Sequence, residues 1–211
     1  MAKDINKLSY IISDLLQSEL PGERSHLKMI PSVRRSFKKN IKDKSAAVMI
    51  LLFQENSEIK ITFIKRTEYE GVHSGQISFP GGMKESSDRG LLHTSIRETS
   101  EETGIDGEDI NILGEISPLF IPVSNFEVKP FVGYLKHTPE FHPDPVEVDH
   151  MIIIPLRHFL KKENLKKEKW NLSGEGVWVP FYSFKNYRIW GATAMILSEF
   201  LDIIEELEPD L

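Results

Sequence analysis

Apolar residues occur along this chain in short runs and alternations, and this pattern predicts β-strands. Ala46–Phe53 is a continuous apolar run of strand length, and Ile59–Lys65 follows it after the polar turn Gln54–Ser57, so the two segments are predicted to form a hairpin. Further strands are expected, in chain order, at Gln76–Phe79, Ile110–Ile116, Phe126–Leu135, Met151–Ile154, Val177–Phe184 and Tyr187–Trp190.

Apolar residues at helical spacing predict helices near both ends of the chain and one in the middle. Asp4–Leu20 has an amphipathic pattern that Pro21 interrupts, and Gly191–Leu207 has the pattern of a long closing helix. A third helix is expected to begin near Ser86–Asp88, which are good N-cap residue types, and to end at Gly104. Mixed strands with helices between them indicate an α/β fold, an α/β/α sandwich.

The length of 211 residues suits one domain with a flanking element. We expect residues 1–44 to be an N-terminal helix with a basic linker, and residues 45–208 to be the main domain. The run Arg34–Lys44 is strongly basic, and it is interpreted either as a solvated linker, which we favour, or as a steering surface for an anionic substrate.

Composition excludes several functional classes. A net charge of −6 argues against general nucleic-acid binding, and the absence of cysteine excludes disulfides and thiolate metal sites. No apolar run approaches the ~20 residues needed to span a bilayer. We therefore expect a cytoplasmic protein with neither a nucleic-acid nor a membrane partner.

The stretch Phe79–Ile105 carries the candidate chemistry. Glu98, Glu101 and Glu102 have the spacing i, i+3, i+4, so a helix places their carboxylates on one face. An arbitrary acidic triplet of this kind is usually a solvated surface. Here a glycine pair precedes it and Arg97 adjoins it, so a divalent cation site is the better interpretation.

These residues resemble the Nudix hydrolase motif, in which a glycine and an acidic residue precede R-E-U-x-E-E-x-G-U, with U aliphatic. The matching residues are Arg97, Glu98, Glu101, Glu102, Gly104 and Ile105, with Thr99 at the first U position. The loop after Gly82 is one residue longer than the commonest form, and Asp88 replaces the upstream glutamate. The resemblance implies the Nudix-type α/β/α sandwich with a mixed sheet and an N-terminal helical extension.

The segment before the glycine loop resembles the coenzyme A pyrophosphatase branch of that family, which carries R-[ST]-x-x-x-R-x-H-x-G before F-P-G-G. The matching residues are Arg66, Thr67, His73, Gly75 and the four residues 79–82. Gly71 stands where the second arginine is expected. The branch implies substrate contacts from Arg66, His73, Gly81 and Phe79.

The resemblance to the Nudix motif also implies a role for each of the matching residues. Glu98 and Glu102 are the expected principal ligands of Mg²⁺ or Mn²⁺, with Glu101 as a further ligand or water-positioning group and the Gly82 carbonyl as a neutral ligand. Arg97 should hold a carboxylate in place, and Asp88 is expected to pair with it rather than bind metal.

A carboxylate from outside the helix could complete the cluster or act as a base. Glu147 is the first candidate, because coenzyme A-type relatives tend to carry a glutamate there, although a surface loop acid is an equal alternative. Glu127 and Asp149 are weaker candidates.

The expected activity is hydrolysis of coenzyme A or its thioesters to 3′,5′-ADP and 4′-phosphopantetheine derivatives. The alternatives are a Nudix pyrophosphatase acting on ADP-ribose or a dinucleotide, and a non-catalytic nucleotide-sensing module. The expected partner is a small nucleoside diphosphate derivative, and a homodimer is left open.

Overall fold

The computed structural model describes residues 5–32, 44–68, 75–122, 124–172 and 174–210. The predicted basic run, apart from Lys44, lies outside the described residues, as do Gly71 and His73.

A mixed eight-stranded sheet forms the centre of the fold. Its main path runs β3 (Ile77–Ser78), β2 (Glu58–Arg66), β1 (Lys44–Glu55), β7 (Phe126–Tyr134) and β5 (Asn111–Glu115). Three strands pair off this path, namely β4 (Gly81–Met83) with β1, β6 (Leu119–Ile121) with β7, and β8 (Val148–Pro155) with β2. The pairing of β1 with β7 is parallel and the other pairings are antiparallel.

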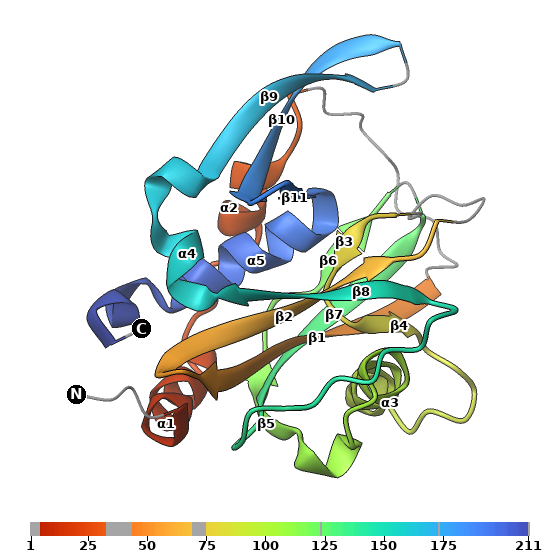
Figure 1. Ribbon diagram of the computed structural model, residues 1–211. Coiled ribbons are helices and arrows are strands. Elements are labelled where there is room, and N and C mark those ends of the chain that lie inside the picture. The colour runs from red at the N-terminus through yellow and green to blue at the C-terminus, as the bar shows by residue number, and fades with distance from the viewer. Residues whose placement is uncertain (1–4, 33–43, 69–74, 123, 173, 211) are drawn as a thin grey trace.

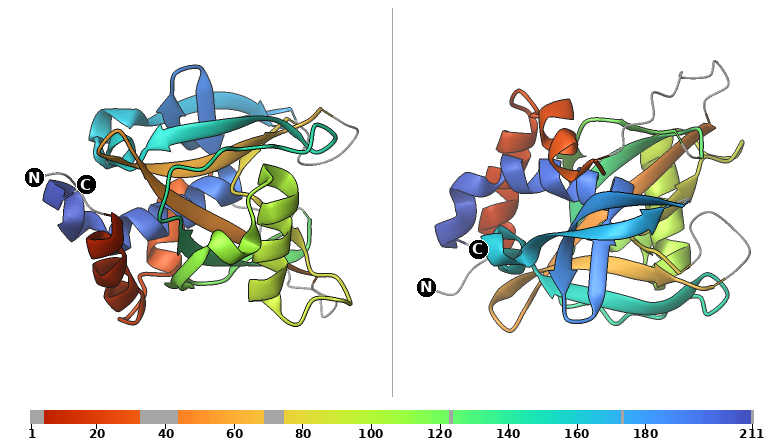
Figure 2. Two further views of the ribbon diagram at one scale, coloured as in Figure 1. Left: turned by 60° about the horizontal axis from the view of Figure 1, so that its bottom comes forward. Right: turned by 90° about the horizontal axis from the view of Figure 1, so that it is seen from above.

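A second, three-stranded sheet has the order β11 (Tyr187–Trp190), β10 (Glu175–Phe184), β9 (Leu165–Leu172). The α-helices are α1 (Ile5–Leu16), α2 (Glu23–His26), α3 (Leu91–Thr103), α4 (Leu156–Leu160) and α5 (Gly191–Ile203). The 3₁₀ segments are η1 (Leu27–Met29), η2 (Gly107–Asp109), η3 (Lys162–Asn164) and η4 (Glu205–Asp210). In Figures 1 and 2 the large sheet lies between α3 on one face and α5 on the other, which confirms the predicted α/β/α sandwich.

Strand β1 supplies side chains to both faces of the sheet. Ile50 and Leu52 join the larger core cluster, which includes α5, whereas Met49, Leu51 and Phe53 join the smaller cluster against α3. Successive side chains of a strand point to opposite faces, so a central strand covered on both sides needs apolar residues at every position. This explains the continuous apolar run seen in the sequence.

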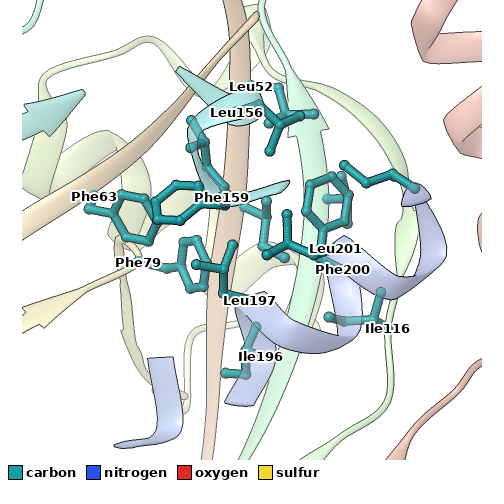
Figure 3. Packing of buried hydrophobic residues seen from close by; sticks show 14 of the residues in the cluster. Leu52, Phe63, Phe79, Ile116, Leu156, Phe159, Ile196, Leu197, Phe200 and Leu201 are labelled. Carbon is teal, nitrogen blue, oxygen red and sulfur yellow. The ribbon is translucent and has the colours of Figure 1, made fainter. Parts of the chain in front are cut away.

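Aromatic rings and the closing helix fill the larger core (Figure 3). The rings of Phe63 and Phe79 stack with centroids 4.7 Å apart, and Phe159 meets Phe63 edge-on at 5.8 Å. Leu197 and Phe200 of α5 are buried in the same cluster. Ring packing at Phe79 therefore anchors the chain between β3 and residues 80–82, which we call the glycine segment.

The N-terminal elements pack onto the domain. Ile5, Leu8, Ile12 and Leu16 of α1 are buried in the larger core cluster. Glu199 of α5 is completely buried, contacts His26 Nε2 at 2.7 Å and accepts a hydrogen bond from Gly22 N at 3.1 Å. The division of the chain at residue 44 stays a prediction.

The glycine segment differs from the predicted loop. Residues 81–83 form β4 and pair antiparallel with Ala46–Val48 of β1. Gly81 has φ +147°, and a Cβ there would collide with the carbonyl oxygen of Ala47 and lie 2.6 Å from the Cα of Val48. Glycine is thus needed because two backbones approach each other closely.

Other boundaries were also missed. Helix α3 begins at Leu91 rather than near Ser86–Asp88, because the Asp88 carboxylate bonds the loop and later helix residues instead of capping a first turn. Strand β9 went unpredicted because its lysine-rich sequence lacks an apolar pattern. Within the described residues, none of the helices has the length and apolar character needed to cross a membrane.

Replacing Gly81 with alanine should lower the free energy of unfolding by about 3 kcal/mol, because the backbone strain and the collision with β1 cannot both be relieved. Gly90→Ala is the matched control, since Gly90 has extended backbone (φ 169°) and a Cβ there meets nothing within 4 Å. Urea unfolding of both variants measures the difference. Equal losses would contradict the close approach at Gly81.

Candidate active site

Carboxylates of α3 meet the backbone of β4 at the end of the glycine segment. The Glu98 carboxylate lies directly against Gly82, since a Cβ on Gly82 would come within 2.6 Å of Glu98 Oε1 and closer still to Oε2. A side chain at position 82 would therefore occupy the space that the carboxylate fills. The glycine pair thus serves two needs, backbone pairing at Gly81 and carboxylate access at Gly82.

Glu102 is 1% exposed and forms a closed arrangement with Gly81 and Arg66. Gly81 N donates to Glu102 Oε2 at 2.7 Å, and Arg66 Nη2 donates to the Gly81 carbonyl at 2.8 Å. Arg66 Nη2 also lies 2.9 Å from Glu102 Oε1. That contact is an ion pair without hydrogen-bond geometry, so the buried Oε1 has no hydrogen-bond partner among the described residues.

Burial makes negative charge costly at this position. Burial above all, together with the charges of Glu98 and Glu147, raises the pKa of Glu102 to about 7, against the opposing effects of Arg66 and the Gly81 N–H. Burial also raises the pKa of Glu98, which Arg97 opposes. A divalent cation would relieve this accumulation of negative charge.

Arg97 links the other acidic groups. Its Nε and Nη2 donate to the two oxygens of Asp88 at 3.0 and 3.1 Å, a bidentate pair. Nη2 also reaches Glu98 Oε1 at 2.9 Å, and Nη1 reaches Glu101 Oε2 at 2.7 Å. The predicted pairing of Asp88 with Arg97 is confirmed.

Asp88 anchors the loop before α3. Besides Arg97, it accepts hydrogen bonds from Glu85 N and Thr94 Oγ1, both at 2.9 Å, and contacts His93 Nδ1 at 2.9 Å. Hydrogen bonds from Arg97, above all, hold the pKa of Asp88 well below its usual range. Both oxygens have protein partners, so Asp88 holds Arg97 in place, and the expectation that it does not bind a metal stays a prediction.

The loop that carries Glu147 is tied to the end of β2. Thr67 N donates to the Glu147 carbonyl at 3.0 Å, and Thr67 Oγ1 donates to the Val146 carbonyl at 2.9 Å. The Glu147 side chain is exposed, and its charge contributes to the raised pKa of both Glu98 and Glu102. Asp149 instead pairs with Lys65 at 2.9 Å. The role of Glu147 as a base stays a prediction.

No ready-made cluster of three acidic or histidine side chains is present in the described part of the chain. Arg97 pairs with both Glu98 and Glu101, and Arg66 pairs with Glu102, so each carboxylate has a cationic partner. A hard divalent ion nevertheless fits the all-oxygen donor set and Glu102 Oε1, which accepts no hydrogen bond from the described residues. Glu98 and Glu102, with Glu101 beside them, would hold it, and the Gly82 carbonyl stays a predicted ligand.

The residues expected to contact substrate have partners of their own in the protein. Phe79 is packed on Phe63, and both backbone polar groups of Gly81 are engaged by Glu102 and Arg66. Sequence reasoning missed that Arg66 is the counter-ion of Glu102. Substrate contacts from these residues stay predictions.

A cavity of about 580 Å³ adjoins the glycine segment on the side facing α5. Its wall combines Arg66 and residues 81–83 with apolar side chains of β1, β7 and the start of α5. Phe79 and Trp190 also line it. An elongated substrate held at the glycines would have room for one of its arms here.

A family model for the NUDIX domain matches residues 43–191, which include the carboxylates and arginines of the candidate site. The chain belongs to the Nudix family. Nudix hydrolases generally need divalent metal ions, in agreement with the oxygen-rich donor set.

Several Nudix proteins are similar in sequence. Nudix hydrolase 15, mitochondrial, of Arabidopsis thaliana is 33% identical over 175 residues, covering 80% of this chain and 61% of that protein. Nudix hydrolase 22, chloroplastic, of the same plant is 34% identical over 173 residues, covering 79% and 57%. The chain therefore spans less than two thirds of the length of these two relatives.

The human mitochondrial coenzyme A diphosphatase NUDT8 is 28% identical over 163 residues, covering 76% of this chain and 69% of that Nudix protein. Among solved structures, a MutT/nudix family protein from Enterococcus faecalis superposes with a TM-score of 0.55 at 16% identity, covering 82% of this chain and 66% of that one. That likeness supports the Nudix fold alone.

The raised pKa of Glu102 predicts a specific pH dependence of stability in metal-free Nudix protein. Between its ordinary value of 4.5 and about 7, the folded state binds more protons than the unfolded chain, so the free energy of unfolding falls as pH rises. Glu102→Gln should remove this fall. Between pH 4.5 and pH 8, its free energy of unfolding should therefore rise relative to that of wild type by up to about 3 kcal/mol.

Urea unfolding in the presence of a chelator, at pH 4.5 and pH 8, measures this difference. Glu108→Gln, at an exposed position outside the cluster, is the matched control and should retain the wild-type pH dependence. An unchanged pH dependence in Glu102→Gln would show that Glu102 has an ordinary pKa.

Proposed function

We propose that this Nudix protein is a divalent-metal-dependent pyrophosphohydrolase that cleaves coenzyme A or its thioesters. The products would be 3′,5′-ADP and 4′-phosphopantetheine or its acylated derivative. The observation that supports hydrolysis most strongly is the buried Glu102 carboxylate, which lies against the Gly81 backbone, has one oxygen without a hydrogen bond from the described residues, and has its pKa raised in part by Glu98 and Glu147.

The reaction inserts water into the pyrophosphate. The water oxygen bonds to one phosphorus, the bridging P–O bond breaks, and a proton is released. A bound Mg²⁺ or Mn²⁺ supplies charge neutralisation and lowers the pKa of water. Glu98 and Glu102 would hold the ion, and Arg97 keeps Glu98 and Glu101 oriented. We assign the water proton to Glu147, whose negative charge contributes to the raised pKa of both Glu98 and Glu102.

The substrate class rests on different observations. The Arg66–Thr67 pair and F-P-G-G resemble the coenzyme A branch, and one relative carries the name coenzyme A diphosphatase. In this structure Arg66 and Thr67 make different contacts. Arg66 forms an ion pair with Glu102, and Thr67 N donates a hydrogen bond to the Glu147 carbonyl. Arg66 thus connects Glu102 to Gly81, and Thr67 fixes the backbone of the loop that carries Glu147. ADP-ribose or a dinucleotide is the second candidate, because Gly71 replaces an expected arginine.

A substrate panel tests the proposal. Protein with Mg²⁺ or Mn²⁺ is incubated with coenzyme A, acetyl-coenzyme A, ADP-ribose and NADH, and the products are separated by liquid chromatography. Release of 3′,5′-ADP from the first two compounds is expected. Turnover of ADP-ribose alone would exclude the coenzyme A assignment while retaining pyrophosphate hydrolysis.

Glu102→Gln should lower the turnover number by at least about 100-fold, because a neutral amide is a far weaker metal ligand. The variant should remain folded, since an amide oxygen can still accept the Gly81 N–H. Glu108→Gln should retain wild-type turnover. Near-normal hydrolysis by Glu102→Gln would remove Glu102 from the metal site.

A further inference from the structure

We propose that the 580 Å³ cavity beside Gly81 and Gly82 binds the pantetheine arm of the substrate, and that the hydroxyls of Ser78 and Ser124 are its polar specificity contacts. This inference rests on the proposed function, because it concerns the arm attached to the pyrophosphate. It adds two specificity-determining residues that the Nudix motif does not contain.

Position supports this assignment. The cavity wall includes Gly81 and Arg66, which contact the buried Glu102 carboxylate, and Gly82, which lies against the Glu98 carboxylate. A pyrophosphate that approaches these two carboxylates therefore has the cavity beside it. A group attached to one phosphate can enter the cavity without leaving the site.

The chemistry of the wall favours an aliphatic group. Val48, Val128 and Ile196 contribute branched apolar surface, and Phe126 and Trp190 contribute aromatic surface. Pantetheine has a dimethyl-substituted carbon and methylene segments, which gain free energy when such surfaces remove them from water.

Two hydroxyls in this wall lack partners. The Oγ atoms of Ser78 and Ser124 are buried and have no hydrogen-bond partner within the described part of the protein. The nearby Thr193 differs, because its Oγ1 donates to the Ile77 carbonyl at 3.1 Å. A buried hydroxyl without a partner costs free energy, so these two serines are better explained by a ligand than by folding. The amide and hydroxyl groups of pantetheine supply the missing partners.

Charge distinguishes the two arms of coenzyme A. Among the described residues that line the cavity, Arg66 alone has a charged side chain. It is already paired with Glu102 and donates a hydrogen bond to the Gly81 carbonyl. The 3′-phosphoadenosine arm carries a phosphate that needs a cation, whereas the pantetheine arm is uncharged. The cavity therefore matches the uncharged arm.

Calorimetric binding of pantetheine and of 3′,5′-ADP to the full chain tests the inference. Ser78→Ala/Ser124→Ala should weaken pantetheine binding about 10-fold, through the loss of two hydrogen bonds, and leave 3′,5′-ADP binding unchanged. The melting temperature of the double variant should stay equal or rise, because unpartnered hydroxyls are removed. Ser86→Ala, at an exposed serine outside the cavity, should change none of these quantities.

Unchanged pantetheine affinity in the double variant, or no pantetheine binding by wild type, would overturn the inference. Weakened 3′,5′-ADP binding in its place would assign the cavity to the nucleotide arm and also overturn it. A third outcome separates the two proposals. If wild type binds pantetheine more tightly than the double variant but does not hydrolyse coenzyme A, the assignment of the cavity is supported and the proposed function is contradicted.

Discussion

The buried carboxylate of Glu102 is the constraint on which the rest of the site depends. Its position requires a backbone N–H donor, which Gly81 supplies, and a counter-ion, which Arg66 supplies. Gly81 can supply that donor only because it lacks a side chain and lies close against β1. One charged group thus connects the helix, the glycine segment and the end of β2.

The charged groups of the site are of two kinds, one that stabilises the loop before α3 and one that a bound cation would stabilise. Arg97 and Asp88 form a saturated ion pair that fixes the loop before α3, and this pair has no need of a ligand. Glu102 is different, because burial above all raises its pKa to about 7 and one of its oxygens accepts no hydrogen bond from the part of the chain that the structure describes. Carboxylates that are costly in the free protein are the groups that a divalent cation would stabilise.

Much of the fold could be predicted because its signals are local. The apolar run of β1, the turn after it and the glycine that ends α3 each follow from a few neighbouring residues. The pairing of β4 with β1 could not be predicted, because it depends on the approach of two backbones distant in sequence. Strand β9 was missed because half of its eight residues are charged, so pairing with β10 determines its structure.

The same distinction applies to the site. The helix spacing indicated Glu98, Glu101 and Glu102, and the types of residue indicated the pairing of Asp88 with Arg97. The attachment of Arg66 to Glu102 and the two unpartnered serines had no signal in the spacing. They depend on how β2, β3, α3 and the segment before β7 meet in three dimensions.

Mn²⁺ binding measured by electron paramagnetic resonance tests the metal site most directly, because the free ion is observed without any need for substrate or turnover. Wild-type protein should remove Mn²⁺ from the free signal, and Glu98→Gln/Glu102→Gln should lose that binding while keeping a cooperative unfolding transition. Equal Mn²⁺ affinity in the two proteins would contradict a metal site at these carboxylates.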